Sequence, residues 1–212
     1  MTVQLKGIDV SSHQGDIDWK KVKASGVEFA IIRLGYGEDV ESQDDRYFFQ
    51  NVKGCEENSI PWGAYLYSYA MDLKLAADEA DHALRMLNGL KPTYPIYIDM
   101  EDTDGYKRKR GGISEQMATD ICVIFCEKLE KAGYCSGVYA NKDWLINRLD
   151  SDKLSRFTIW LAQWSSVPTY DGEFQIWQYT SDGSVDGISG CADMNLCYVN
   201  FPAAIKTVST KC

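Results

Sequence analysis

The sequence lacks a long apolar run. Its longest stretch of this kind, over residues 29–34, contains Arg33 and falls well short of the roughly 20 residues that a membrane-spanning helix needs. The N-terminus also lacks the basic region and the apolar stretch of a secretory signal. We therefore expect no insertion into a membrane. We expect synthesis in the cytoplasm without a signal peptide, followed by release or by export along another route.

An excess of positive charge is absent as well. The 212 residues include 22 Lys and Arg against 31 Asp and Glu, which gives a formal net charge of −9 and an isoelectric point near 4.7. Nucleic acids and anionic membrane surfaces are held mainly by Lys and Arg on phosphate, so this balance argues against both as partners. No Pro/Gly/Ser linker divides the chain, and we expect a single domain.

Sets of metal ligands are scarce. The two histidines, His13 and His82, lie far apart, and none of the seven cysteines forms a C-x-x-C pair. Because an odd number of cysteines cannot all pair within one chain, we favour reduced, buried thiols over one or two disulfides and over a metal site. We expect that the protein needs no cofactor and no metal. The cysteines are Cys55, Cys122, Cys126, Cys135, Cys191, Cys197 and Cys212.

Short β-rich runs alternate with helical patterns along most of the chain. The predicted strands are 4–10, 27–35, 62–69, 94–101 and 135–140, then 157–164, 174–179 and 193–198 with no helix between the last three. Helices are predicted over 18–25, 44–58 and 143–149, from a cap at Asp72 to residue 88, and after a cap at Ser114, with Asp18 as a third cap. The polar segment 102–112, with its basic run at 107–110, is interpreted as a solvated loop.

Alternation of strands and helices indicates a parallel sheet with helices outside it. The pattern therefore predicts an α/β fold, a single irregular TIM-like barrel of about five β/α units plus three further β-strands. An open doubly wound sheet is the alternative, but no glycine-rich phosphate turn follows the first strand. The barrel is the better prediction.

Acidic residues stand at the predicted strand ends where the sites of such barrels collect. Asp9 ends the first strand, Asp99 and Glu101 end the fourth, and Asp193 opens the last. Asp99 and Glu101 point to the same face of their strand, with Cα atoms about 6.6 Å apart. Two carboxylates at that spacing push their pKa values apart, as glycoside hydrolysis requires. Solvated acids and a divalent-metal site are the alternatives.

Aromatic residues gather near the same strand ends. Tyr67, Tyr139, Trp160 and Trp177 lie on four different predicted strands. Such side chains either pack in the core or line a sugar cleft, since a pyranose presents an apolar face and a rim of hydroxyl groups. Arg33 is expected to pair with a carboxylate inside the barrel, because an unpaired buried guanidinium is costly. Arg33 either stabilises the fold or binds the substrate.

Eight short motifs follow one another in an order that resembles a known family. They are residues 7–15 with Asp9, 29–35 with Arg33, 63–67, 98–101, 137–141, 160–162, 177–179 and 193–195. Together they resemble the glycoside hydrolase family 25 lysozymes, the N-acetylmuramidases of bacterial autolysins and phage endolysins. The resemblance runs from about residue 6 to residue 201, which is nearly the whole chain.

The resemblance implies an irregular β/α barrel that cleaves the β-1,4 bond between N-acetylmuramic acid and N-acetylglucosamine in bacterial peptidoglycan. Glu101 matches the general acid, Asp99 matches the second catalytic carboxylate, and Asp9 and Asp193 match supporting acids. The aromatic candidates match positions of the sugar groove. The catalytic domain would span residues 1–202, and 203–212 would be a C-terminal tail or the start of a linker. Family members often carry a wall-binding module after the barrel, so we expect this chain to be either a lone catalytic domain or one cut from a longer lysin.

Two other functions stay open at this point. One is a glycan-binding barrel without turnover, although a lectin has no need of a poised acid. The other is a hydrolase acting on chitin, whose catalytic strand usually shows a longer acidic run (D-x-x-D-x-D-x-E). The role of Asp99 is open too, as nucleophile, as base, or as an anion that assists attack by the acetamido group of the substrate. We favour the acetamido route.

Overall fold

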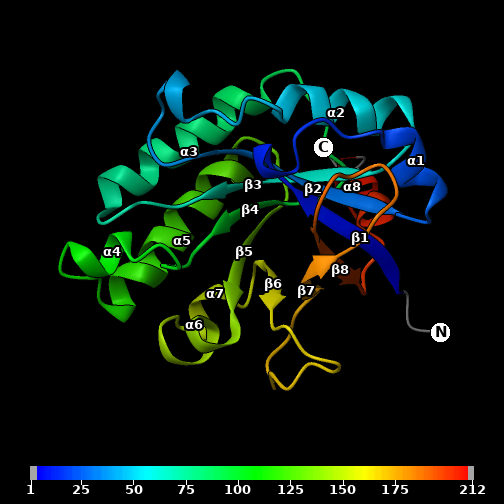
Figure 1. Ribbon diagram of the computed structural model, residues 1–212. Coiled ribbons are helices and arrows are strands. Elements are labelled where there is room, and N and C mark those ends of the chain that lie inside the picture. Colours follow the sequence, from blue (N-terminus) through cyan, green and yellow to red (C-terminus); the bar gives the residue numbers. More distant parts are fainter. Residues whose placement is uncertain (1–3, 210–212) are drawn as a thin grey trace.

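Eight β-strands close into a barrel in the order in which they follow along the chain (Figure 1). The computed structural model describes residues 4–209. The first seven strands run parallel, and β8 runs antiparallel to both β7 and β1. The start of β8 therefore lies at the end of the barrel where the other strands finish. The strands are β1 (Leu5–Val10), β2 (Phe29–Tyr36), β3 (Trp62–Tyr67), β4 (Ile96–Asp99), β5 (Ser136–Asn141), β6 (Thr158–Ala162), β7 (Ile176–Gly183) and β8 (Ala192–Cys197).

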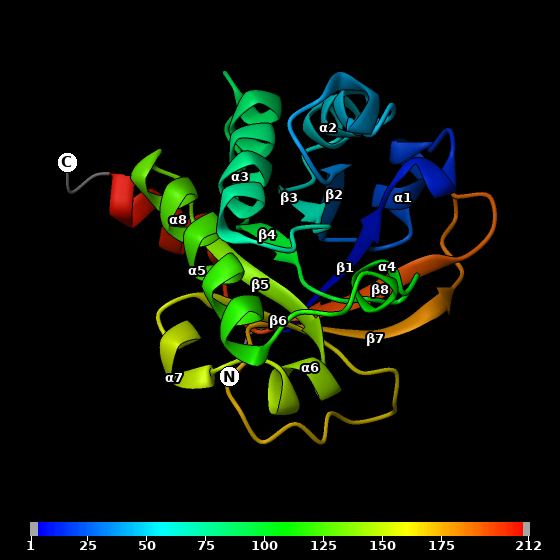
Figure 2. The ribbon, with the colours of Figure 1, turned by 90° about the vertical axis from the view of Figure 1, so that its left-hand side faces the viewer.

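Helices cover the outside of the barrel along its first strands, with α3 and α5 packed side by side (Figure 2). No helix stands between β6 and β8, a stretch that the structure describes throughout. The predicted α/β barrel with three further strands is therefore confirmed. Within residues 4–209, no helix combines the length and the apolar character that a membrane span requires. The main helices are α1 (Trp19–Ala24), α2 (Phe48–Glu57), α3 (Leu73–Leu87), α5 (Glu115–Lys131) and α6 (Lys142–Asn147).

Three further helices lie outside the predicted ones. The sequence patterns do not predict α4 (Tyr106–Lys109) and α7 (Ser151–Leu154), because four residues are too few for a helical period to show. The interpretation of 102–112 as a loop is wrong where α4 stands. α8 (Phe201–Ser209) overlaps the segment 203–212 that was expected as a tail, and residues 210–212 lie outside the described part.

Side-chain caps fix where three of the helices begin. Asp18, Asp72 and Ser114 each accept a hydrogen bond from the backbone N–H three residues further on, at 3.1, 2.9 and 3.1 Å. These bonds satisfy N–H groups that have no partner inside the helix. The three predicted N-caps are confirmed.

The alternation of side chains along the strands builds two apolar layers. Ile96 and Ile98 of β4 join the layer between barrel and helices, whereas Tyr97 points into the barrel. At the end where the parallel strands begin, the rings of Phe29 and Tyr94 stack at 4.7 Å and Tyr94 contacts Phe201 of α8 at 5.3 Å. The rings of Phe29, Tyr94 and Phe201, here called the aromatic plug, close one end of the barrel. Polar residues lie at the other end.

Six of the seven cysteines lie in the described part of the chain, and all six are free thiols. Cys55, Cys122, Cys126 and Cys197 are buried, Cys135 is half-buried and Cys191 is exposed. Cys212 lies outside the described residues. The prediction of buried thiols therefore agrees with the structure at four of these six positions and is wrong for Cys135 and Cys191.

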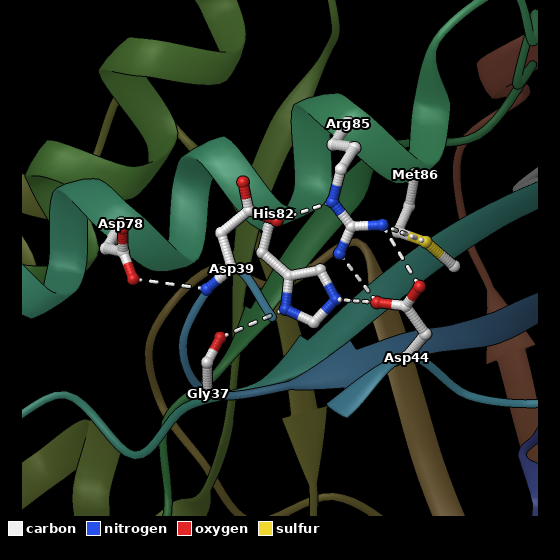
Figure 3. A network of polar contacts seen from close by, with 7 residues as sticks. All are labelled: Gly37, Asp39, Asp44, Asp78, His82, Arg85 and Met86. Atoms are coloured by element: carbon white, nitrogen blue, oxygen red, sulfur yellow. Dashed lines mark hydrogen bonds and ion pairs between the residues drawn. The ribbon is translucent and has the colours of Figure 1, made fainter. Parts of the chain in front are cut away.

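A network of polar contacts ties the loop between β2 and α2 to helix α3 (Figure 3). The buried His82 faces the carbonyl of Gly37 with Nδ1 at 3.1 Å and the carboxylate of Asp44 with Nε2 at 2.9 Å. Both ring nitrogens of His82 therefore face oxygen atoms of the loop. Arg85 pairs with the same Asp44 at 2.7 Å and with Asp39. The network therefore holds the loop at its first half, through Gly37 and Asp39, and at its second half, through Asp44.

Asp44 is the centre of this network. Burial acts to raise the pKa of its carboxyl group, but Arg85 and His82 outweigh burial and hold the pKa below its ordinary value. A carboxylate whose pKa is lowered by folding stabilises the folded chain above its unfolded pKa, and this stabilisation is lost as the pH falls through the lowered value.

Asp44→Asn is therefore expected to lower the free energy of unfolding at pH 7 by about 1–3 kcal/mol, because Arg85 and His82 lose a charged acceptor. The deficit should shrink at pH 3, because the carboxyl group of the unfolded wild-type chain then takes up a proton and the stabilisation by ionised Asp44 begins to be lost. Urea unfolding followed by tryptophan fluorescence at the two pH values measures both effects. Glu41→Gln, at an exposed carboxylate of the same loop, is the control. Equal stability of Asp44→Asn and wild type at pH 7 would contradict the assignment.

Candidate active site

Four carboxyl groups meet at the end of the barrel opposite the aromatic plug. Asp9 lies near the end of β1, Asp99 is the last residue of β4, and Glu101 follows in the loop beyond it. Asp193 of β8 is the register partner of Asp9 in the antiparallel pairing of these strands. The structure therefore brings together the four acids singled out in the sequence, and their charges act on one another.

Two side-chain amides hold Asp9. Its Oδ2 accepts hydrogen bonds from Gln178 Nε2 at 3.0 Å and from Asn195 Nδ2 at 2.7 Å. The orientation of each amide follows from its other partner. Gln178 Oε1 accepts from the Tyr139 hydroxyl at 3.0 Å, and Asn195 Oδ1 accepts from the Trp160 indole at 2.8 Å. Tyr139 and Trp160 therefore act on Asp9 through the amides.

Asp9 and Asp193 form a coupled pair. Burial raises the pKa of Asp9 to about 8, the charge of Asp193 adds to this effect, and the hydrogen bonds from Asn195 and Gln178 oppose it. Burial also raises the pKa of Asp193 to about 6. Two carboxyl groups placed this way do not both ionise readily. Near neutral pH, the pair therefore holds about one proton.

Asp99 and Glu101 form the second pair. Asp99 is 5% exposed, and its buried Oδ1 has no hydrogen-bond partner among the described residues. Burial first, and the charge of Glu101 second, raise the pKa of Asp99 well above its ordinary value, against the charges of Lys107 and Arg33. Burial also raises the pKa of Glu101, and a hydrogen bond from Thr103 opposes it. Glu101 is only half-buried, so it is the member of the pair that solvent reaches.

A groove of about 450 Å³ opens beside these acids. Tyr67 lies on its wall, and the pKa of Tyr67 is raised by burial and by the charges of Glu101 and Asp99, which shows that the groove adjoins the pair. Tyrosine rings and polar side chains line this groove together, as a sugar site requires. The lining residues are His13, Arg33, Tyr36, Tyr67, Tyr69, Thr103 and Asp104.

Arg33 is anchored on that wall by a buried carboxylate. Its Nε and Nη2 both lie 2.8 Å from Asp45 Oδ2, and Nη2 also donates to Ser12 Oγ at 2.8 Å. The sequence predicts a carboxylate partner for Arg33 inside the barrel. The structure does give Arg33 a buried carboxylate partner, but this partner is Asp45, which lies in the loop between β2 and α2 and not on a barrel strand. This residue follows Asp44, so the network around His82 also fixes the partner of Arg33.

The tryptophans near the site differ in exposure. Trp160 is 1% exposed inside the barrel and Trp177 is 5% exposed in the outer apolar layer, so protein covers the rings of both. Trp164, just beyond β6, is 65% exposed, and its indole donates to Gln178 Oε1 at 3.1 Å. The ring open to a ligand is therefore that of Trp164, which was not among the candidate residues.

Gln178 and Lys107 are two further residues of the site that the sequence analysis did not single out. Strand alternation carries a signal for Gln178, because it points inward wherever its neighbour Trp177 points outward. Lys107 is 2% exposed although it stands in a run of basic residues, and no local pattern separates it from the other three. Among residues 4–209, no group of three or more His, Cys, Asp or Glu is arranged to hold a metal ion.

Buried carboxyl groups at the carboxyl ends of the strands of a closed β/α barrel, with an aromatic groove beside them, define a barrel glycoside hydrolase. Comparison with known proteins gives the family. The chain belongs to the glycosyl hydrolases of family 25, whose family model matches residues 8–188. The resemblance seen in the sequence motifs is confirmed.

Two relatives illustrate the similarity in sequence. The chain is 30% identical over 192 residues to the autolytic lysozyme of Clostridium acetobutylicum, which covers 90% of this chain and 55% of that protein. It is 29% identical over 203 residues to lysozyme M1 of Streptomyces globisporus, which covers 92% of this chain and 68% of that protein. The chain thus spans little more than half the length of the first relative.

Solved structures show the same fold. The modular autolysin LytC of Streptococcus pneumoniae, in complex with a synthetic peptidoglycan ligand, superposes with a TM-score of 0.80 at 30% identity, covering 92% of this chain and 47% of that one. A family 25 glycosyl hydrolase from Bacillus anthracis gives a TM-score of 0.77 at 26% identity, covering 95% and 92%.

The raised pKa of Asp9 leads to a prediction about stability. The folded chain holds a proton on Asp9 between about pH 4 and pH 8, where the unfolded chain does not, so the free energy of unfolding falls as the pH rises through this window. The side chain of Asp9→Asn does not titrate, so its free energy of unfolding does not fall through this window. The amide oxygen can still accept hydrogen bonds from Gln178 and Asn195. At pH 8 the thermal midpoint of this variant should exceed that of the wild type by about 2–8 °C.

Thermal unfolding followed by circular dichroism at pH 8 and pH 4 tests this prediction. The difference should be small at pH 4, where the wild-type carboxyl group is protonated in the folded chain. Asp171→Asn, at an exposed position, should match the wild type at both pH values. A lower midpoint for Asp9→Asn at pH 8 would show that ionised Asp9 stabilises the fold.

Proposed function

We propose that this chain is a lysozyme that hydrolyses the β-1,4 bond between N-acetylmuramic acid and N-acetylglucosamine in bacterial peptidoglycan. The observation that carries the proposal is the pair of carboxyl groups of raised pKa, Asp99 and Glu101, at one strand end of a family 25 barrel. Relatives named as lysozymes support the substrate. A similar structure solved with a synthetic peptidoglycan ligand supports it further.

Glu101 is the general acid in this proposal. Its half-buried side chain faces a sugar that enters from solvent, whereas Asp99 lies beneath it. A bound sugar removes water from Glu101 and raises its pKa further, which favours the protonated form. Once Glu101 holds the proton, its repulsion on Asp99 ceases. The charges of Lys107 and Arg33, which oppose the effect of burial on the pKa of Asp99, then favour the ionised form of Asp99 in this proposal.

The acetamido group of the substrate is the nucleophile in this proposal. Its carbonyl oxygen attacks the anomeric carbon of N-acetylmuramic acid while Glu101 protonates the leaving oxygen, and the bond to the next sugar breaks. Ionised Asp99 stabilises the positive charge of the oxazolinium that forms. Water then attacks the anomeric carbon, gives its proton to Glu101 and regenerates the acetamido group.

The other candidate residues support this step. Asp9 and Asp193 keep a partly protonated pair next to the reacting sugar, and Tyr139 and Trp160 orient Asp9 through Gln178 and Asn195. Tyr67 and Arg33 contact the sugar from the groove wall. Trp177 is the predicted groove residue with the weakest support, because its ring is covered. We propose residues 1–202 as the catalytic unit and the cell wall, reached after release from the cytoplasm, as its place of action.

Mass analysis of the products from purified cell walls tests the function. A muramidase releases fragments that end in reducing N-acetylmuramic acid. A glycan-binding barrel would sediment with the walls and release nothing, and a chitin hydrolase would act on chitin while leaving the walls intact. Either of these two results would overturn the proposal.

Glu101→Gln should lower the rate of wall lysis by about 10²–10⁴-fold, because the amide is nearly isosteric but cannot deliver a proton. The fold and the binding to walls should persist, as measured by circular dichroism and by sedimentation with walls. Glu115→Gln, at an exposed glutamate of α5, is the control and should lyse walls at the parent rate. A Glu101→Gln rate within about threefold of the parent would place the acid elsewhere.

Trp164→Ala tests the exposed ring beside the site. Loss of a stacking face for a sugar should raise KM for soluble glycan fragments by about 5–50-fold with a smaller change in kcat, since a stacked aromatic ring contributes on the order of 1–2 kcal/mol. Val167→Ala, on the same loop and 61% exposed, is the matched control. If both variants keep the wild-type KM, the indole does not contact the substrate.

A further inference from the structure

A buried lysine lies behind the catalytic pair, outside the groove. Lys107 of α4 is 2% exposed, and a lysine is rarely buried to this degree without partners. Its burial lowers its pKa, against the charges of the acids around it. The proposed reaction so far gives this side chain no task.

The ammonium group of Lys107 joins two strand ends. Nζ donates to the backbone carbonyls of Ser68 and of Glu101, the latter at 3.1 Å. Ser68 follows the end of β3, and its own N–H donates to the carbonyl of Asp99 at 3.0 Å. One cation thus fastens the backbone on both sides of the carboxylate pair.

The conformation of the loop after Glu101 returns the chain so that the side chain of Lys107 reaches the backbone of Glu101. The carboxylate of Asp102 accepts the backbone N–H of Lys107 at 2.7 Å and that of Arg108 at 2.9 Å. These two bonds cap the short helix α4 and reverse the chain. They explain why only one member of the basic run 107–110 is buried.

The two acceptors of Nζ, the carbonyls of Ser68 and Glu101, are neutral, so the charge of Lys107 acts on the carboxyl groups nearby. The charged and titratable groups that face it are Glu79 from α3, Asp99 from β4, Asp102 from the loop before α4 and Cys122 from α5. Its charge lowers the pKa of Asp99 and of Glu101 against the effect of burial. The charge of Lys107 therefore acts on both members of the catalytic pair.

Glu79 is already held from another side. It is 1% exposed and accepts hydrogen bonds from Ser68 Oγ at 2.7 Å and from the N–H of Tyr69 at 2.6 Å. Burial raises its pKa to about 7, so near neutral pH it is only partly ionised. The positive charge of Lys107 is therefore not fully neutralised by Glu79.

We propose that Lys107 is a positioning residue for hydrolysis, which fixes the backbone carrying Asp99 and Glu101 and holds a buried positive charge behind them. Its catalytic meaning rests on the proposed function. When Glu101 holds the proton, Asp99 must keep a negative charge at a site that water barely reaches, and a cation behind it stabilises that state.

Three substitutions at Lys107 separate its contacts from its charge. Lys107→Met removes both, Lys107→Gln keeps one donor and removes the charge, and Lys107→Arg keeps the charge and the donors. Lys109→Met, on the exposed side of the same helix, is the control. Carboxyl ¹³C NMR titration measures the pKa values of Asp99 and Glu101 without reference to activity, and wall lysis is measured as a function of pH.

The Met and Gln variants should raise the pKa values of both carboxyl groups by about one unit or more. Both limbs of the pH–rate profile should then move to higher pH, and kcat should fall about tenfold or more with KM little changed. Lys107→Arg and Lys109→Met should keep the wild-type pKa values. Unchanged pKa values in a folded Lys107→Gln variant would overturn the proposal.

The two readouts separate this proposal from the proposed function. If the wild type releases no muropeptides but the pKa values move as expected, the lysozyme proposal fails and the charge role of Lys107 stands. If the Met and Gln variants do not fold, Lys107→Arg decides, because its charge must then keep the pKa values at those of the wild type. A shift of more than about half a unit in that variant would contradict the charge role.

Discussion

Carboxyl groups buried beside one another are the constraint on which the rest of this site depends. A carboxylate taken out of water is costly unless it is protonated, hydrogen-bonded or faced by a cation. The barrel uses each of these means. Two amides hold Asp9, burial and the charge of Asp193 raise the pKa of Asp9 and so favour its protonated form, and the charges of Lys107 and Arg33 act on Asp99. The buried Oδ1 of Asp99 has no hydrogen-bond partner among residues 4–209.

The frame around the acids is rigid on every side that the structure describes. The stacked rings of Phe29 and Tyr94 close the far end of the barrel, and Gly7 is required there because a Cβ atom would lie 2.3 Å from the Phe29 ring. On the groove side, Arg33 is fixed by Asp45, and the neighbouring Asp44 by His82 and Arg85. Such a frame keeps the acids from separating, which would relieve their repulsion and remove their function.

Local patterns predicted the parts of the site that depend on one strand or one helix. The spacing of Asp99 and Glu101 was enough to place both carboxyl groups at one strand end, although β4 stops at Asp99 and Glu101 lies in the loop beyond it. The caps at Asp72 and Ser114 depend only on neighbouring backbone. The remaining parts depend on contacts between distant segments. Gln178 reaches Asp9 across 169 positions of sequence, and Lys107 differs from its basic neighbours only in where α4 places it. Trp164 and Trp160 look alike in sequence, and only the closed barrel buries one and exposes the other.

The central claim is that one acid and one ionised neighbour are enough, because the acetamido group of the substrate supplies the nucleophile. The most direct measurement is NMR of the first-formed anomer, together with cleavage rates on wall polymer before and after removal of the N-acetyl groups of muramic acid. The account predicts net retention on normal substrate, and cleavage of the de-N-acetylated polymer slower by about 10²-fold or more. Inversion, or undiminished cleavage of the de-N-acetylated polymer, would contradict it and make Asp99 a base or a direct nucleophile.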